Sequence, residues 1–396
     1  RTFNTAAMKF KGILILLLLA GLVATAGKIV QEKPFKPTIT PYVKVQFWNV
    51  VSQGVTTDDE VAADRFASYF RRGRLGVKGN VLPELSYDVM LAYDNLAKDG
   101  FSSTKEVMNA GAVTLWSAYF TYDLHCESDW LNVTGGYFLP HLSRESTTSP
   151  WTTTSLDKTE NSCYLRQFVT GKANGISPGI NLGGLGELGK QTLIYNVSII
   201  NRQDVVSITE ANWSPVFLGH VMLNFGDKEF SKYNYCFSNN TYKEQTSATF
   251  GVGFSTQGKT DIFERTQTIS ADVTIYLASL KIDGEYSHLY RDNNLEYTAD
   301  CFMLRTGYNI FLKNCWILEP SAMFEKFTGD KNYDDVSYFD GSDKKLDVGV
   351  NLISAEKKVK VNLHYVYHDG DGIKNRYIKN TIHPGNYISL GLQLKV

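Results

Sequence analysis

Three cations at even spacing are the residues whose types and positions point most directly to chemistry. Arg72, Arg74 and Lys78 share one parity, and the apolar residues Leu75 and Val77 share the other. Because residues two apart on an extended strand point the same way, the pattern predicts a strand with one cationic and one apolar face. If the apolar face meets lipid, the cations point into the lumen of a barrel and attract anions. The alternative is the solvated face of a soluble sheet.

Acidic residues occupy similar positions in other alternating segments. In residues 84–96, large apolar or aromatic side chains at odd positions alternate with even positions that include Asp88 and Asp94. Other ionisable residues on predicted polar faces are Asp283, Glu285, Glu319, Glu325, Lys358, Lys360, His364 and His368. A lumen with basic and acidic sectors would order water and screen out apolar solutes. Overall anion selectivity therefore stays open at this stage.

The sequence carries few signatures of enzymes or metal sites. His364 and His368 stand four apart, but on a strand this spacing separates them by roughly 13 Å, too far to share a metal. The sequence contains no Walker loop. Its five cysteines are scattered without close pairs. We therefore expect a protein that is not an enzyme, with no catalytic residues, metal or cofactor; an outer-membrane hydrolase with a Ser–His pair is the remote alternative.

Composition favours strands over helices. The chain has 23 Tyr and 22 Phe but only 10 Pro, together with 32 Gly for turns. No run of 18 or more consecutive apolar residues occurs, which argues against a helical membrane protein. A barrel remains possible because each of its strands gives a weaker signal.

The N-terminal segment has the pattern of an export signal. Lys9 and Lys11 precede an apolar stretch at 13–23, and Ala24-Thr25-Ala26 has the small-x-small form of a cleavage site. We therefore expect residues 8–26 to be a secretory signal peptide and 1–7 an upstream remnant, leaving 27–396 as one domain. A membrane anchor is the alternative, but the apolar stretch is short for that. Acidic residues would outnumber basic ones in 27–396, so nucleic acid is not an expected partner.

Sixteen segments of the remaining chain alternate between polar and apolar residues, and their number is even, as a closed bacterial barrel requires. They are 38–50, 66–79, 84–96, 113–124, 129–138, 176–186, 191–202, 214–226, 246–257, 267–279, 281–291, 297–312, 315–327, 345–353, 357–368 and 386–396. Short and long links alternate between them, with one exception: 227–245 is long where a short turn is expected. The longest link, 139–175, needs either disorder or a function, and we expect it to fold inward and narrow the lumen. A soluble sandwich or propeller is the alternative fold.

The order of several motifs resembles the phosphate-selective porin O and P family of Gram-negative outer membranes. The motifs are Arg-Arg-Gly-Arg-Leu-Gly-Val-Lys-Gly at 71–79, Gly-Gly-Tyr-Phe-Leu-Pro at 135–140, Ser-Arg-Glu at 143–145, Gly-Val-Asn at 349–351 and Leu-Gln-Leu-Lys-Val at 392–396. The resemblance implies a trimeric diffusion porin with sixteen strands, whose third external loop enters the lumen. By position it places Arg144, Glu145 and Arg166 on that loop, facing Arg72 and Arg74 across a constriction.

The sequence thus predicts an all-β transmembrane barrel of about sixteen antiparallel strands. The expected function is passive diffusion of small hydrophilic solutes across a bacterial outer membrane, with a weak preference for anions such as phosphate. Outer-membrane lipid, these solutes and two further copies of the chain are the expected partners. The predicted pore-lining residues are Arg72, Arg74, Lys78, Arg144, Glu145 and Arg166. The competing interpretation is a structural or adhesive barrel with a plugged lumen.

Overall fold

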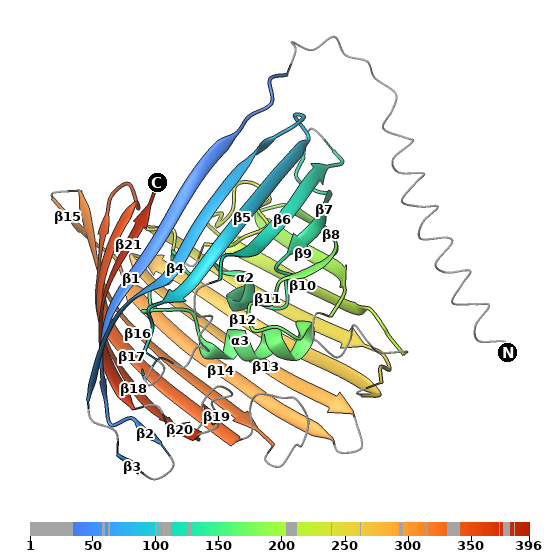
Figure 1. Ribbon diagram of the computed structural model, residues 1–396. Coiled ribbons are helices and arrows are strands. Elements are labelled where there is room, and N and C mark those ends of the chain that lie inside the picture. Colours follow the sequence, from blue (N-terminus) through green and yellow to red (C-terminus); the bar gives the residue numbers. More distant parts are fainter. Residues whose placement is uncertain are drawn as a thin grey trace.

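Long strands form the wall of a closed antiparallel barrel in the computed structural model (Figure 1). The structure describes residues 35–57, 60–61, 64–99, 102, 104, 112–125, 128–202, 212–238, 240–261, 263–292, 296–313, 315–330, 341–371, 373–374, 381–383 and 385–396. The predicted signal peptide at 8–26 and the residues before it lie outside these ranges. Within them, no helix is long and apolar enough to cross a membrane.

The wall has sixteen strands within the described ranges, and each coincides with one predicted segment. They are β1 (Thr40–Gln53), β4 (Arg65–Asn80), β5 (Leu85–Leu96), β6 (Thr114–Asp123), β7 (Asn132–Phe138), β8 (Ser177–Leu188), β9 (Gln191–Ile200), β10 (Val216–Gly226), β11 (Gln245–Gln257), β12 (Arg265–Ala278), β13 (Leu280–Asp292), β14 (Tyr297–Tyr308), β16 (Trp316–Gly329), β17 (Gly341–Ser354), β18 (Val359–Gly370) and β21 (Asn386–Lys395). The short β15 (Ile310–Leu312) continues β14 along β16. The all-β prediction is confirmed.

Pairing between sequence neighbours runs around the barrel and then closes. β1 pairs antiparallel with β4 on one side and with β21 on the other, from Lys44 opposite Lys395 to Gln53 opposite Asn386. Closure leaves no open sheet edge, so the wall satisfies its backbone hydrogen bonds internally, as a span in lipid requires.

The two faces of the wall differ in the way the alternating pattern predicts. In β12, Thr268, Ser270 and Thr274 are buried inside, whereas Ile269 and Leu277 are exposed outside. Large apolar residues are exposed on the other strands as well, including Phe217, Val221, Phe250, Phe254, Leu304, Val348, Leu363 and Leu390. An apolar outer surface and a polar interior are the arrangement of a membrane barrel.

Links between strands are mostly short at one end of the barrel and longer at the other. Short turns include 81–84, 189–190 and 355–358, and the opposite end carries 54–64, 97–113 and 139–176. At the long-loop end, β2 (Thr56–Thr57), β3 (Glu60–Val61), β19 (Ile373–Lys374) and β20 (Thr381–His383) form a small second sheet. Figure 1 shows this sheet at the bottom and the C-terminus at the top.

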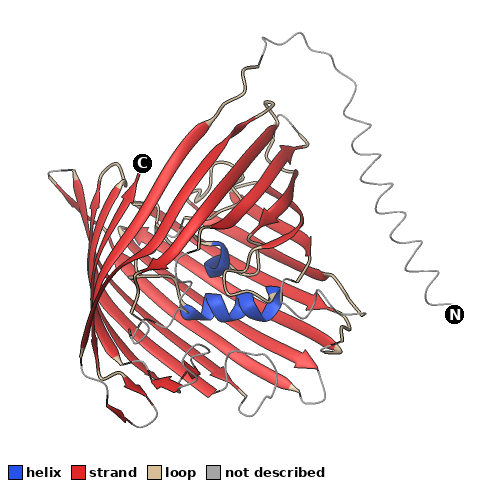
Figure 2. Cartoon of the chain, in the orientation of Figure 1, coloured by secondary structure: helices blue, strands red, loops and turns tan. Residues whose placement is uncertain are grey.

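The link 139–176, hereafter the inward loop, lies inside the barrel and carries two helices (Figure 2). α2 (Arg144–Thr147) is capped by Ser143, whose hydroxyl accepts from the Ser146 amide in a capping box. α3 (Glu160–Thr170) is capped by Thr159 at its N-terminus and by Gly171 at its C-terminus, whose φ of 80° suits glycine. The expectation that the third long loop folds inward is confirmed.

Candidate constriction and solute passage

Backbone carbonyls of the inward loop bind side chains from the far wall. Gln393 of β21 donates to the Trp151 carbonyl at 2.8 Å, and Lys360 of β18 donates to that of Thr153 at 2.6 Å. Ser321 of β16 and Asn351 of β17 donate to the Thr154 carbonyl at 2.7 and 2.6 Å. Because four strands hold this stretch of four residues, the loop is fixed to one side of the lumen.

An ion-pair cluster three residues further along the loop attaches it to β4. Asp157 accepts from Arg71 Nη2 and from Arg72 Nη1, each at 2.7 Å. Gln46 opposes Arg72 and Phe47 opposes Phe70, so Arg71 is the extra residue of a β-bulge, and both guanidinium groups reach the interior. Burial disfavours the carboxylate of Asp157, but Arg71 and Arg72 outweigh this effect and hold its pKa well below its usual value. Arg72 is a predicted site residue, whereas Arg71 and Asp157 were not foreseen.

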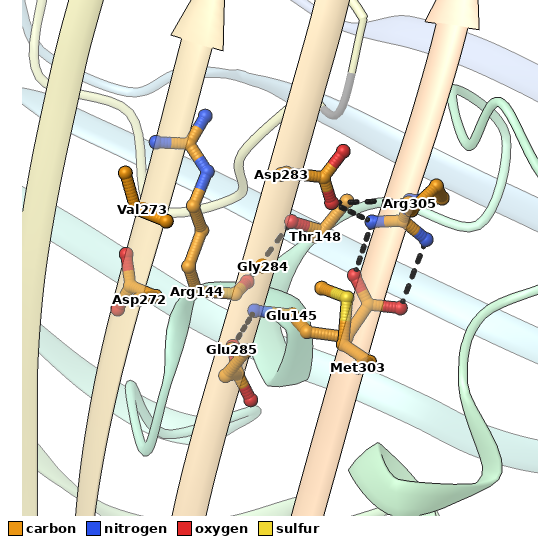
Figure 3. Close-up of a pocket in the computed structure, with 10 residues that line it drawn as sticks. All are labelled: Arg144, Glu145, Thr148, Asp272, Val273, Asp283, Gly284, Glu285, Met303 and Arg305. Atoms are coloured by element: carbon orange, nitrogen blue, oxygen red, sulfur yellow. Dashed lines mark hydrogen bonds and ion pairs between the residues drawn. The ribbon is translucent and has the colours of Figure 1, made fainter. Parts of the chain in front are cut away.

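A second cluster holds α2 against β13 and β14 (Figure 3). Arg305 donates to Glu145 at 2.7 Å and to Asp283 at 2.6 Å, and Lys281 also pairs with Asp283. The Glu145 amide donates to Glu285 at 2.8 Å. Burial favours the neutral acid of Glu145, but Arg305 and Lys158 hold its pKa below the usual value.

The partner of Arg144 comes from the opposite end of the barrel. Its guanidinium group forms a buried ion pair with Glu229, which lies on the exceptional long link between β10 and β11. We call residues 227–244 the inner arm. The Ser149 amide donates to the Phe237 carbonyl at 2.8 Å, so the inner arm and the inward loop also share backbone hydrogen bonds.

The other three predicted site residues have separate surroundings. Arg74 forms an ion pair with Asp94 of β5 and lies 4.0 Å from the ring of Trp116. Arg166 donates to the Ser146 carbonyl at 2.9 Å, within the inward loop. Lys78 is exposed and lines a cavity of about 430 Å³ at the short-turn end.

Burial of the inward side chains locates the accessible part of the lumen. On β12 and β16, inward residues such as Thr274 and Glu319 are completely buried under the loops. On β5 and β6, by contrast, the inward residues Asp88, Tyr119 and Thr121 keep partial access to solvent and line the same cavity as Lys78. A passage through the barrel would therefore have to run beside β5 and β6 and the short-turn end of β4, where these residues line the cavity.

The acidic and the basic groups of the inward loop have different kinds of partner. Glu145, Asp157 and Glu160 all form ion pairs with cations of the wall, the last with Lys345 at 2.5 Å. Lys158 and Arg166 instead both donate to the neutral carbonyl of Ser146, each at 2.9 Å. Burial, together with repulsion from Arg166, lowers the pKa of Lys158 to about 7. Among the described residues, these acidic groups of the loop thus bind cations of the wall, whereas Lys158 and Arg166 bind a carbonyl of the loop itself.

Comparison with known proteins rests on structure alone. No family model and no curated protein matches the sequence. An anion-selective porin from Comamonas acidovorans matches with a TM-score of 0.55 and 13% identity, over 91% of this chain and 100% of that one. OprB of Pseudomonas putida matches with a TM-score of 0.60 and 7% identity, over 90% and 94% of the two chains. The chain has a porin fold.

A further structure with this porin fold is OmpT of Vibrio cholerae, an outer-membrane protein, with a TM-score of 0.50 and 10% identity over 92% of this chain and 99% of its own. Identities this low establish the fold alone. The sequence signals for the site were weaker than those for the fold, because the partners of Arg72 and Arg144 lie about 85 positions away in the chain.

Proposed function

We propose that the protein is a passive channel of a bacterial outer membrane for small hydrophilic solutes. The observation that carries this proposal is the uneven filling of the lumen. The inward loop is fixed to β13, β14, β16–β18, β21 and β4, whereas polar residues on β5 and β6 keep access to solvent. A polar passage inside an apolar outer surface admits solutes that dissolve in water. Members of the phosphate-selective porin O and P family, which the sequence resembles, have this role.

We further propose a weak preference for anions, phosphate among them. Lys158 and Arg166 on the inward loop have neutral hydrogen-bond acceptors, and Arg74 and Lys78 stand on the wall strand β4. Cations at a narrow, low-dielectric opening raise the local concentration of anions. Asp94, the partner of Arg74, reduces this field, which is why the proposed preference is weak.

The proposal includes the expected partners and location. The exposed apolar side chains of the wall suit outer-membrane lipid, and we propose a homotrimer on the resemblance to trimeric porins. His364 and His368 hydrogen-bond the buried Asp347 and Asp343 at 2.6 and 2.5 Å, which favours a structural role and not a catalytic one.

The test is single-channel recording in planar bilayers. Folded, purified protein should give discrete conductance steps, and a salt gradient should shift the reversal potential toward the value for anions. Folded protein without any conductance would overturn the proposal of an open channel. A reversal potential that reports cations would overturn the anion preference alone.

The plugged barrel is the second candidate, and one observation favours it. The inner arm enters from the short-turn end and pairs with the inward loop through Arg144–Glu229 and the Phe237 backbone. Two segments that meet from opposite ends could close a lumen. Deletion of 139–175 distinguishes the candidates, because it should raise the conductance of a porin and have little effect on a barrel that another segment plugs.

A further inference from the structure

The inner arm is an ordered segment in the interior of the barrel. It leaves β10 at Gly226 and returns to β11 at Gln245, and its base is closed like a hairpin: the Asp227 amide donates to the Thr246 carbonyl at 2.9 Å. The Thr246 amide donates back to the Asp227 carboxylate at 2.7 Å. Residues between these closing bonds are therefore held together at the short-turn end and extend into the lumen.

Polar contacts fix the inner arm to the wall on two sides. Tyr233 donates to Asn196 of β9 at 2.6 Å, and its own hydroxyl accepts from Asn181 of β8 at 3.1 Å. Near the other end of the arm, Asn240 binds Glu319 of β16 and also Asn309. Because β8–β9 and β16 lie in different parts of the ring, the inner arm spans the interior between them.

Aromatic packing joins the inner arm to the inward loop. The ring centroids of Tyr235 and Phe237 lie 4.6 Å and 4.9 Å from the ring centroid of His141. Tyr235 and Phe237 are 8% and 2% exposed. Two buried aromatic rings and the buried ion pair of Arg144 with Glu229 meet at this contact. Its packing therefore resembles that of a protein core.

The two residues that flank Tyr235 in the chain are exposed, unlike Tyr235 itself. Asn234 and Cys236 are exposed, as alternation along an extended segment requires. Asn234 lines the cavity at the short-turn end, next to the inward residues of β5 and β6. Lys44 on the wall and Lys158 on the inward loop both act electrostatically on the thiol of Cys236. At Asn234, the exposed edge of the arm therefore faces the accessible side of the lumen.

We propose that the inner arm forms the second half of the constriction, so that solutes pass between its Asn234–Cys236 edge and the wall strands β4–β7. The inference rests on the proposed channel function and adds a solute-contacting surface to it. The ion pair between Arg144 and Glu229 holds the arm and the inward loop together and so sets how far both project into the passage. The opening is then narrowed from both ends of the barrel, and the exceptional link 227–244 has a functional reason.

The native thiol of Cys236 gives the first test. A charged methanethiosulfonate reagent added to open channels should attach to Cys236 and cause a stepwise loss of single-channel current. The Cys236→Ser variant, which differs by one atom, should conduct as before and lose this response. Current that is insensitive to the reagent while mass spectrometry shows modified Cys236 would overturn the inference and leave the channel function intact.

The second test changes the arm itself. Replacement of residues 229–242 by a short Asn-Gly turn should increase single-channel conductance, because it removes one half of the constriction. The milder Glu229→Gln variant should raise the frequency of current fluctuations, and Glu264→Gln, at an exposed ion pair with Lys259, is its matched control. Unchanged conductance in the arm-shortened, folded variant would overturn the inference.

A folded wild-type protein that gives no current would overturn the proposed open channel. The arm-shortened variant would still test the role of the inner arm separately. If the arm-shortened variant then conducts, the arm obstructs the lumen as inferred. If it is also silent, both the channel and the arm's role in it are wrong.

Discussion

Asp157 offers the most direct test of how the inward loop is held. The substitution Asp157→Asn preserves shape and removes the negative charge that Arg71 and Arg72 share. Asparagine can still accept hydrogen bonds with one oxygen, but the two charge-assisted contacts at 2.7 Å are lost as a pair. We therefore expect the segment around Asp157 to detach from β4 more often, while the wall stays folded.

The magnitude follows from the burial of the cluster. Removing one partner of a buried ion pair costs about 3–5 kcal/mol, and since 17% of the Asp157 side chain is exposed we expect a value near 3 kcal/mol. Each 1.4 kcal/mol is a factor of ten, so the detached state should become about 100-fold more populated. Hydrogen bonds to the Trp151, Thr153 and Thr154 carbonyls remain, so the effect should be confined to the neighbourhood of Asp157.

Hydrogen exchange followed by mass spectrometry measures this local opening. Amides around 155–158 should exchange about 100-fold faster in the variant than in the wild type, if that opening limits their exchange. Glu187→Gln is the control, because Glu187 and Lys228 form an ion pair with more than half of each side chain exposed, and such pairs contribute about 0–1 kcal/mol. Equal exchange in both variants would refute the assignment of Asp157 as an anchor.

Acid should imitate the substitution. Because the folded-state pKa of Asp157 lies below its unfolded value, its stabilising contribution is complete above the unfolded pKa of about 4. That contribution is lost as the pH falls through the lower, folded-state pKa. Exchange near 155–158 should accelerate there in the wild type and respond less in Asp157→Asn.

Three further results are expected. With a pKa of about 7, Lys158 is charged below and neutral above that value, so anion preference in reversal potentials should fall between about pH 6 and pH 8, and Lys158→Gln should abolish this dependence. Arg305→Gln should lower the free energy of unfolding by about 3–5 kcal/mol, because it leaves two buried carboxylates without their shared cation, whereas the exposed Arg265→Gln should change it by less than about 0.5 kcal/mol. Carboxylates at the short-turn end and cations at the loop should make the current–voltage curve asymmetric, and Asp88→Asn should reduce that asymmetry.

The fold was predictable because the signal was repeated around the barrel. Each wall strand carries the same two-residue period, and a closed ring leaves few other arrangements for sixteen such segments of similar length. Aromatic residues near strand ends were less informative. Tyr308 and Tyr365 are exposed on the outer face, whereas Trp48 packs inside against Tyr69 with ring centroids 6.1 Å apart.

The site was less predictable because its contacts are distant in sequence. A bulge opposite Gln46 turns Arg71 inward beside Arg72, and strict alternation would have placed it outside. The one link that broke the short-turn rule, 227–244, was visible as an exception. Its partner residue Arg144 was also visible, but nothing in the spacing of charges could pair it with Glu229, 85 positions away.

The anchoring of the inward loop and the charge of the passage are two aspects of one arrangement. The loop gives Glu145, Asp157 and Glu160 to wall cations, which leaves Lys158 and Arg166 with neutral acceptors. A variant that loosens an anchor therefore also exposes wall cations: Asp157→Asn would release positive charge at Arg71 and Arg72. If the passage runs beside β4, that variant should become noisier and more anion-selective together. A plugged barrel would show the faster exchange and no change in current, so the pair of measurements tests the anchor and the channel separately.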